Sequence, residues 1–92
     1  MIRAHLLIEG RVQGVGYRAN TRRMAYKLNL RGWVRNLRNG DVELLVEGPE
    51  IEVQKLVVWC HRGPTSAFVS KVAVEKSEAT GEFESFTTKS TF

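Results

Sequence analysis

The stretch GWVRNLRNGDVELLVE, residues 32–47, decides the fold of this 92-residue chain. Two short segments rich in strand-forming residues, 32–37 and 42–47, flank the dipeptide Asn39-Gly40. Asn-Gly between two such segments is the strongest short-range signal of a β-hairpin, and we expect a two-residue type I′ turn in which both residues have positive φ. Apolar and polar residues alternate in the second segment, so one face of the hairpin should be buried.

A strand, a loop and a helix are predicted before the hairpin. Residues 3–9 are apolar and rich in strand formers. Three glycines follow within residues 10–16, which indicates a loop with unusual backbone torsions. Residues 17–28 change to a helical period, because side chains that suit a core recur at steps of three and four on one face: Tyr17, Thr21, Met24, Ala25 and Leu28.

A second helix and another strand are predicted after the hairpin. The helix opens at Gly48-Pro49-Glu50, where proline suits the first helical position and the carboxylate suits the positive end of the helix dipole. It closes at Arg62-Gly63-Pro64, a basic last turn followed by two residues that end helices. Beyond it we expect a strand over residues 68–75, a polar turn over 77–81, a short final strand over 83–88 and a tail over 90–92.

The predicted order is β-α-β-β-α-β, with residues 83–88 as an extra edge strand. This is the order of the ferredoxin-like sandwich, an α+β fold in which an antiparallel sheet carries two helices on one face. A chain of this length has room for one such domain, over residues 1–92. The fold hosts many functions, so it does not identify an activity.

The composition is that of an ordinary globular protein, with 42% hydrophobic and 26% charged residues. The single cysteine, Cys60, excludes an intramolecular disulfide, and no Cys/His cluster has the spacing of a zinc site. The longest apolar runs are too short to span a bilayer, and the N-terminus lacks the pattern of a secretory signal. We therefore expect a cytoplasmic protein that folds without a metal ion and has no membrane partner.

The positive charge is concentrated in the first part of the chain. Residues 1–38 contain nine Lys or Arg residues and one acid, Glu9, whereas residues 39–92 contain five basic and nine acidic residues. Such a basic segment suits an anionic ligand. The simpler alternative is that these long side chains, Arg22, Arg23 and Arg35 among them, form a solvated face that helps to attract anions.

The glycine-rich loop and the helix start that follows it, residues 10–18, have the features of a phosphate-binding site. N–H groups at a helix N-terminus lack intrahelical partners, the helix dipole adds positive charge, and glycines let an anion approach the backbone. Arg18, on the first turn of the helix, could bind two oxygens of the same phosphate. The alternative is a tight strand-to-helix turn that needs glycines for its geometry alone.

Two better-known phosphate motifs fit less well. Gly14, Gly16 and Ala19 match the dinucleotide fingerprint G-x-G-x-x-A, but that fold needs more parallel sheet than this chain can build. The P-loop pattern fails because no Gly-Lys-Ser/Thr follows the loop.

Two stretches of the sequence resemble one known family. GRVQGVGYR, residues 10–18, resembles the signature loop of the acylphosphatase family, whose usual form is GRVQGVGFR. GWVRNL, residues 32–37, with Asn39-Gly40 and Val42-Glu43 after it, resembles the second signature of that family. EGP at residues 47–49 and GP at residues 63–64 also fall where the family commonly has them, so the resemblance extends from the first strand to the fourth.

The resemblance implies a metal-independent acylphosphatase, which hydrolyses the carboxyl-phosphate bond of small acyl phosphates and uses no cofactor. Arg18 and Asn36 would be the catalytic residues: Arg18 would bind the phosphate, and Asn36 would hold the attacking water. The backbone amides of the loop would complete the phosphate cradle, and they belong to Gln13, Gly14, Val15, Gly16 and Tyr17. A monomer is the expectation for this family.

The chain departs from the family pattern at Tyr17, where phenylalanine is usual, and in a more polar C-terminal strand. Two other functions remain as alternatives: a non-catalytic phosphate-binding module and a nucleic-acid-binding module of the same fold. RNA-binding sheets of this topology carry stacking aromatic residues on strands one and three. Residues 3–9 offer only His5 there and residues 42–47 offer no aromatic residue, so we expect no nucleic-acid partner.

Overall fold

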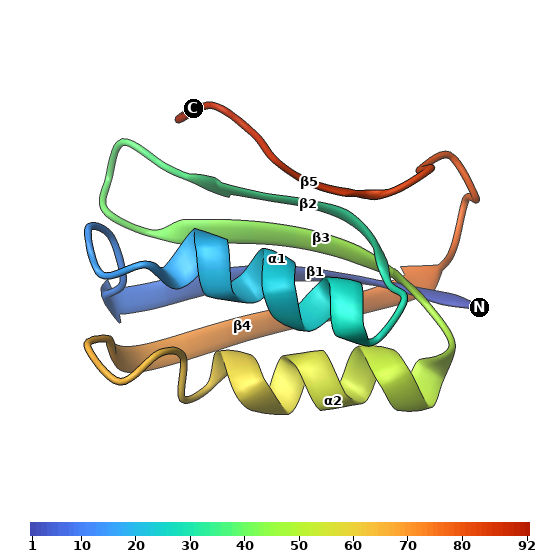
Figure 1. Ribbon diagram of the computed structural model, residues 1–92, viewed down its shortest axis with the longest axis horizontal. Helices are drawn as coiled ribbons and strands as arrows, with labels where there is room; N and C mark the ends of the chain where they lie inside the picture. The colour runs from blue at the N-terminus through green and yellow to red at the C-terminus, as the bar shows by residue number, and fades with distance from the viewer.

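A five-stranded sheet with both helices packed on one of its faces forms the computed structural model, which describes residues 1–92 (Figure 1). The elements follow the predicted order: β1 (Ile2–Arg11), α1 (Tyr17–Lys27), β2 (Arg31–Asn36), β3 (Val42–Gly48), α2 (Glu50–Cys60), β4 (Phe68–Glu78) and β5 (Phe86–Thr88). The strand order across the sheet is β4-β1-β3-β2-β5. The ferredoxin-like α+β fold predicted from the sequence is therefore confirmed.

The hydrophobic core lies between the sheet and the two helices. Alternate residues of the central strands point into it and are fully buried: Ala4, Leu6 and Ile8 from β1, and Val42, Leu44 and Val46 from β3. The predicted stripe of α2 covers them from one side, with Val53, Leu56, Val57 and Cys60 all buried. Burying a Val, Leu or Ile side chain contributes about 1.5–3 kcal/mol, so this alternation holds the sheet against the helices.

The predicted core face of α1 is buried in part. Tyr17, Thr21 and Ala25 are buried as predicted, whereas Met24 and Leu28 are only partly buried. The hydroxyl of Thr21 donates a hydrogen bond to the Tyr17 carbonyl oxygen within the helix (2.8 Å). Arg22 and Arg23, which lie off this stripe, are exposed.

The turn between β2 and β3 differs from the predicted type I′ turn. Register pairs Asn36 with Val42, so five residues connect the strands, and the Gly40 N–H donates to the Leu37 carbonyl oxygen (3.1 Å). Only Gly40 has a positive φ, of 100°, whereas a type I′ turn requires positive φ at both central residues. The Asn39 side chain instead accepts a hydrogen bond from the Asp41 N–H (3.0 Å), a side-chain turn that leaves Asn39 outside the left-handed region.

Three predicted boundaries are corrected by the structure. β1 continues past residue 9 to Arg11 through an irregularity at Glu9 and Gly10, where the pairing with β4 shifts. β4 continues to Glu78 instead of ending at residue 75, because its polar end pairs with the start of β1 and an edge strand tolerates polar side chains. Pro49 precedes the first helical residue of α2, because its ψ of 141° is extended and not helical.

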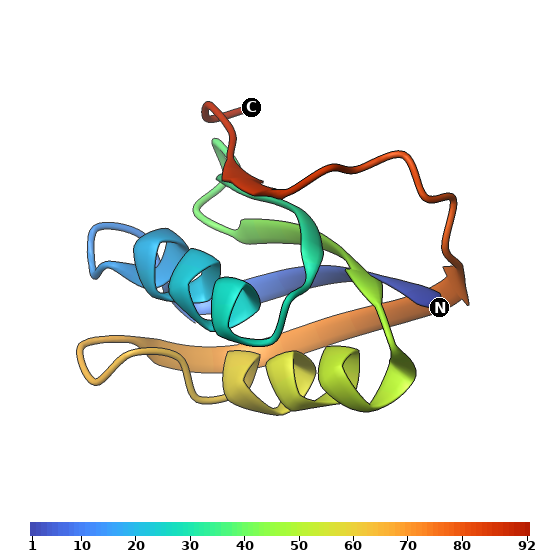
Figure 2. The same ribbon diagram turned by 45° about the vertical axis from the view of Figure 1, so that its right-hand side comes forward.

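The last part of the chain completes the sheet in an unexpected direction. β5 contains only three residues of the predicted segment 83–88, and it pairs parallel to β2, so the sheet is mixed and not wholly antiparallel. Figure 2 shows the reason, since the segment after β4 runs from one edge of the sheet to the other before β5 begins.

Residues 90–92 were expected to be a tail. They are tied to β2, because the Phe92 N–H donates to the Asn36 carbonyl oxygen (3.0 Å) and the Arg38 N–H donates to the Phe92 carbonyl oxygen (3.1 Å).

Neither helix is long and apolar enough to cross a membrane.

Candidate active site

The loop between β1 and α1 presents a row of unpaired backbone N–H groups at one end of the molecule. Gly16 is the N-cap of α1 and has a left-handed backbone (φ 79°), which turns the chain from the loop into the helix. None of the N–H groups of residues 13–19 donates a hydrogen bond to another group of the chain. The first turn of α1 contains no acidic residue that would neutralise the positive end of the helix dipole. The loop can therefore accept an anion.

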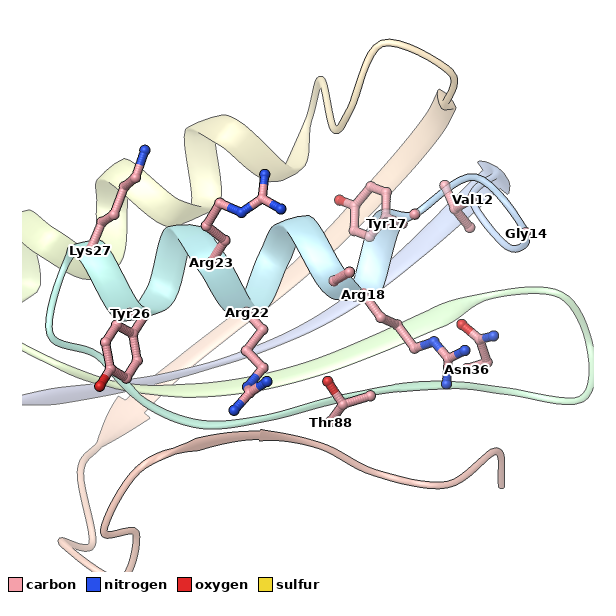
Figure 3. Close-up of a pocket in the computed structure, with 12 residues that line it drawn as sticks. Val12, Gly14, Tyr17, Arg18, Arg22, Arg23, Tyr26, Lys27, Asn36 and Thr88 are labelled. Carbon is pink, nitrogen blue, oxygen red and sulfur yellow. The ribbon is translucent and has the colours of Figure 1, made fainter.

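Arg18 and Asn36 project into the space beside this loop, and Figure 3 shows their side chains pointing toward each other. Arg18 comes from the first turn of α1, is half-buried, and forms no hydrogen bond or ion pair within the chain. Asn36 is the last residue of β2 and lies on the helix-covered face, because it shares the alternation of Gly32 and Val34. Two residues far apart in the sequence are thus brought to one place by the packing of α1 on the sheet.

The side chain of Asn36 contains a buried acceptor without a partner. Asn36 is 9% exposed, and its Oδ1 atom has no hydrogen bond in the structure. Its backbone carbonyl oxygen, in contrast, accepts the hydrogen bond from the Phe92 N–H. Buried polar atoms are nearly always paired, so an unpaired one beside a row of free donors indicates a site for a polar ligand or an ordered water.

Gln13 takes a different position from the other residues of the predicted cradle. Its Nε2 atom donates to the carbonyl oxygens of Leu37 (2.7 Å) and Asp41 (2.8 Å) in the β2–β3 turn. The Gln13 side chain therefore fastens the loop to the turn that follows Asn36. The Val15 side chain packs against the core. The side chains of Gln13 and Val15 therefore do not line the cleft.

The Tyr17 side chain also points away from the cleft. Its ring is buried and packs at a tilt against Trp59, with the ring centroids 5.5 Å apart. Its hydroxyl donates a hydrogen bond to the Cys60 carbonyl oxygen (2.7 Å). Burial raises the pKa of Tyr17 above its ordinary value, so the hydroxyl remains a donor. Tyr17 thus ties the start of α1 to the end of α2, and only its backbone is available to the loop.

The cleft extends well beyond Arg18 and Asn36. It has a volume of about 780 Å³ and continues along the outer side of α1. Its lining includes residues that the sequence analysis had assigned to a solvated face or had not considered: Arg22, Arg23, Tyr26, Lys27 and Thr88. For Arg22 and Tyr26 the spacing of four from Arg18 was a signal that could have found them, because residues four apart share one side of a helix.

On the face of the sheet without helices, Arg35 has a structural role. It faces away from its neighbour Asn36 as expected, but it is not simply solvated: its Nε atom pairs with Glu43 Oε1 (2.6 Å), and its guanidinium stacks on Trp33 and Phe92. Burial alone would raise the pKa of Glu43, but its hydrogen bonds with His5 and Arg35 lower it on balance. No group of three His, Cys, Asp or Glu side chains comes together in a way that could hold a metal ion.

Comparison with known proteins identifies the family. The model of the family described as acylphosphatase matches residues 4–88. Acylphosphatases of Marinobacter nauticus and Methylococcus capsulatus are 50% and 51% identical to this chain over 86 residues, which are 94% of this chain and 94% of each relative. This chain belongs to the acylphosphatase family. Acylphosphatases are hydrolases, and this chain is an enzyme of that class.

The architecture agrees with that of a solved acylphosphatase. The crystal structure of acylphosphatase from Bacillus subtilis superposes with a TM-score of 0.93 at 35% identity, and the match covers 97% of this chain and 99% of that chain.

Proposed function

We propose that this acylphosphatase hydrolyses small acyl phosphates to a carboxylate and inorganic phosphate, with the phosphoryl group held between the loop and Arg18. The proposal takes residues 1–92 as one monomeric domain that acts in the cytoplasm on small molecules and not on nucleic acid. The observation that carries it is the unpaired Asn36 Oδ1 atom, which is buried beside the free N–H groups of residues 13–19.

The free N–H groups and Arg18 supply the charge that a phosphoryl group requires. The N–H groups of the loop and of the first turn of α1 are supported by the helix dipole. The Arg18 guanidinium can donate two parallel hydrogen bonds to phosphoryl oxygens. This charge is fixed before the substrate arrives, so it stabilises the transition state without reorganisation. The proposal therefore includes neither a metal ion nor an organic cofactor.

Asn36 is proposed to orient the attacking water. Its Oδ1 atom accepts a hydrogen bond from the water, which aims an oxygen lone pair of the water at phosphorus in line with the leaving oxygen. As the water oxygen bonds to phosphorus, the bond between phosphorus and the acyl oxygen breaks and the carboxylate leaves with the electron pair. The water proton passes to a phosphoryl oxygen. Because a carboxylic acid has a low pKa, the leaving carboxylate departs unprotonated, and no general acid is needed to protonate it.

The test is the hydrolysis of benzoyl phosphate in the presence of EDTA by the native chain and by Arg18→Ala and Asn36→Ala. We expect turnover by the native chain, and a loss of about 10²–10³-fold or more in either variant, as for removal of a donor that acts only in the transition state. Arg18→Ala should also weaken the binding of inorganic phosphate, whereas Asn36→Ala should leave it nearly unchanged. Phosphate binding by the native chain without turnover would instead indicate a binding module, and equal effects of both variants on phosphate affinity would contradict the separate roles.

A further inference from the structure

The cleft beside the proposed phosphoryl site is large and basic. Its volume of about 780 Å³ lies in the range of pockets that enclose whole small molecules, roughly 300–1,000 Å³. Four basic residues line it, namely Arg18, Arg22, Arg23 and Lys27, and no carboxylate does. The part of the cleft beyond Arg18 therefore remains to be explained.

Arg22 is the basic residue that extends the phosphoryl site. Figure 3 shows Arg18, Arg22 and Tyr26 projecting from the same side of α1 toward β2 and β5, whereas Arg23 and Lys27 project to the other side. The Arg22 side chain is exposed and forms no hydrogen bond or ion pair within the chain. Four helical residues rise by about 6 Å, so the Arg22 side chain leaves α1 about 6 Å beyond that of Arg18.

Arg22 also works against the stability of its own helix. It lies four residues from Arg18, and like charges at this spacing repel. No acidic residue stands in the first turn of the helix to offset these two charges. A ligand that brings negative charge into the cleft would relieve this repulsion.

We infer that the preferred substrate is an acyl phosphate whose acyl group carries a second anionic group, and that Arg22 binds that group. This inference rests on the proposed function, since it places the phosphoryl group at Arg18 and Asn36. The second anion then lies about 6 Å along α1 from the phosphoryl group, and Figure 3 shows Thr88, which also lines the cleft, between Arg22 and the pair Arg18 and Asn36. Arg22 is a specificity residue here and does not touch the reacting atoms.

The test compares two rigid substrates of the same shape, 4-carboxybenzoyl phosphate and 4-carbamoylbenzoyl phosphate, which differ in the charge of the para group. The variant is Arg22→Gln. Its matched control is Lys71→Gln, which removes one positive charge from an exposed residue of β4 that lies opposite Glu9 on the face without helices. Any effect of net charge alone should appear equally in both variants.

Arg22→Gln should lower kcat/KM for the carboxylate substrate about threefold to fivefold, the worth of an exposed ion pair, and leave the carbamoyl substrate unchanged. Lys71→Gln should leave the ratio of the two kcat/KM values as it is in the native chain. High salt should reduce the preference of the native chain for the carboxylate, because an exposed ion pair is screened. A ratio that is the same in the native chain and in Arg22→Gln overturns the inference.

Binding of two phosphonate analogues, in which a methylene replaces the bridging oxygen, separates this inference from the proposed function. Isothermal titration calorimetry should give a lower Kd for the carboxylate analogue than for the carbamoyl analogue, and Arg22→Gln should abolish the difference. If the native chain hydrolyses neither substrate, the proposed function fails, and the phosphonate affinities still decide the role of Arg22. Equal affinities of the native chain for both phosphonates refute that role.

Discussion

Replacing Tyr17 by phenylalanine should lower the stability of this protein and leave its turnover unchanged. The Tyr17 hydroxyl donates to the Cys60 carbonyl oxygen at 2.7 Å, and both atoms are buried. Cys60 is the last residue of α2, and the residue four positions later, whose N–H would normally bind that carbonyl oxygen, is Pro64, which has no N–H. The hydroxyl of Tyr17 therefore satisfies a carbonyl group that nothing else in the chain reaches.

The size of the stability loss follows from the absence of any other partner for the Cys60 carbonyl oxygen. A typical intramolecular hydrogen bond contributes about 0.5–1.5 kcal/mol, and leaving a buried acceptor unpaired costs about 1–3 kcal/mol. Tyr17→Phe keeps the ring and its contact with Trp59 (5.5 Å between centroids), so no cavity is added. We expect the free energy of unfolding to fall by about 1–2 kcal/mol. In a domain of this size that corresponds to a Tm lower by about 5–15 °C.

Urea denaturation and thermal melting measure the loss of stability, and the hydrolysis of benzoyl phosphate measures whether the active site is affected. Tyr26→Phe is the matched control, because Tyr26 lies on the same helix, is 75% exposed and has a hydroxyl that forms no hydrogen bond within the chain. This control variant should have the same Tm as the native chain. The side chain of Tyr17 points away from the cleft, so kcat of folded Tyr17→Phe should match the native value. Equal stability of the two variants, or loss of turnover in folded Tyr17→Phe, would refute this account.

Three further predictions concern the loop, a buried carboxylate and the end of α2. Gln13→Ala removes two hydrogen bonds to the β2–β3 turn, so it should lower the free energy of unfolding, measured by urea denaturation, by about 1–2 kcal/mol. It should also reduce kcat by more than the smaller fraction of folded protein explains. A native kcat in the folded variant would contradict this prediction. For Glu47, burial favours a higher pKa, but hydrogen bonds from Thr80, Arg3 and Gly81 lower it on balance. Its stabilisation should therefore be complete above about pH 4.5, the value in the unfolded chain, and be lost as the pH falls through the lower folded pKa. Glu47→Gln should melt with a weaker pH dependence in that acidic range, and an unchanged dependence would exclude Glu47 as its source. Gly63→Ala should destabilise by about 2 kcal/mol in thermal melts, because φ is 67° and the new methyl group would meet the Tyr17 ring at 2.7 Å; a variant as stable as the native chain would show that the ring can move aside.

Much of the fold could be predicted because it depends on short-range patterns. The buried stripe of α2 and the alternation of Val42, Leu44 and Val46 agree with the structure, since side-chain periodicity decides which face of an element is apolar. The hairpin was also predicted, but its turn type was not. Asn-Gly fits two turn geometries, and the pairing of Asn36 with Val42 selects the longer loop.

The C-terminal part of the chain could not be predicted in the same way. β5 has three residues and pairs parallel to β2, and the hydrogen bonds of Phe92 with Asn36 and Arg38 join residues far apart in the sequence. Polar strand residues carry no local signal of partner or direction. Parallel pairing depends on where the connecting segment emerges, which only the assembled sheet defines.

The sequence by itself determined the elements, their order and the residue types of the site: a glycine-rich loop entering a helix, Arg18 on its first turn and Asn36 at the end of a strand. Only the tertiary structure decided where the side chains of this candidate site lie and which partners they have. It turned Gln13 to the hairpin and Tyr17 into the core, left the Asn36 Oδ1 atom buried without a partner, and extended the cleft to Arg22. The physical reason is range: torsional preferences and apolar periodicity act between neighbours in the chain, whereas a side chain's burial and partners depend on the elements packed around it.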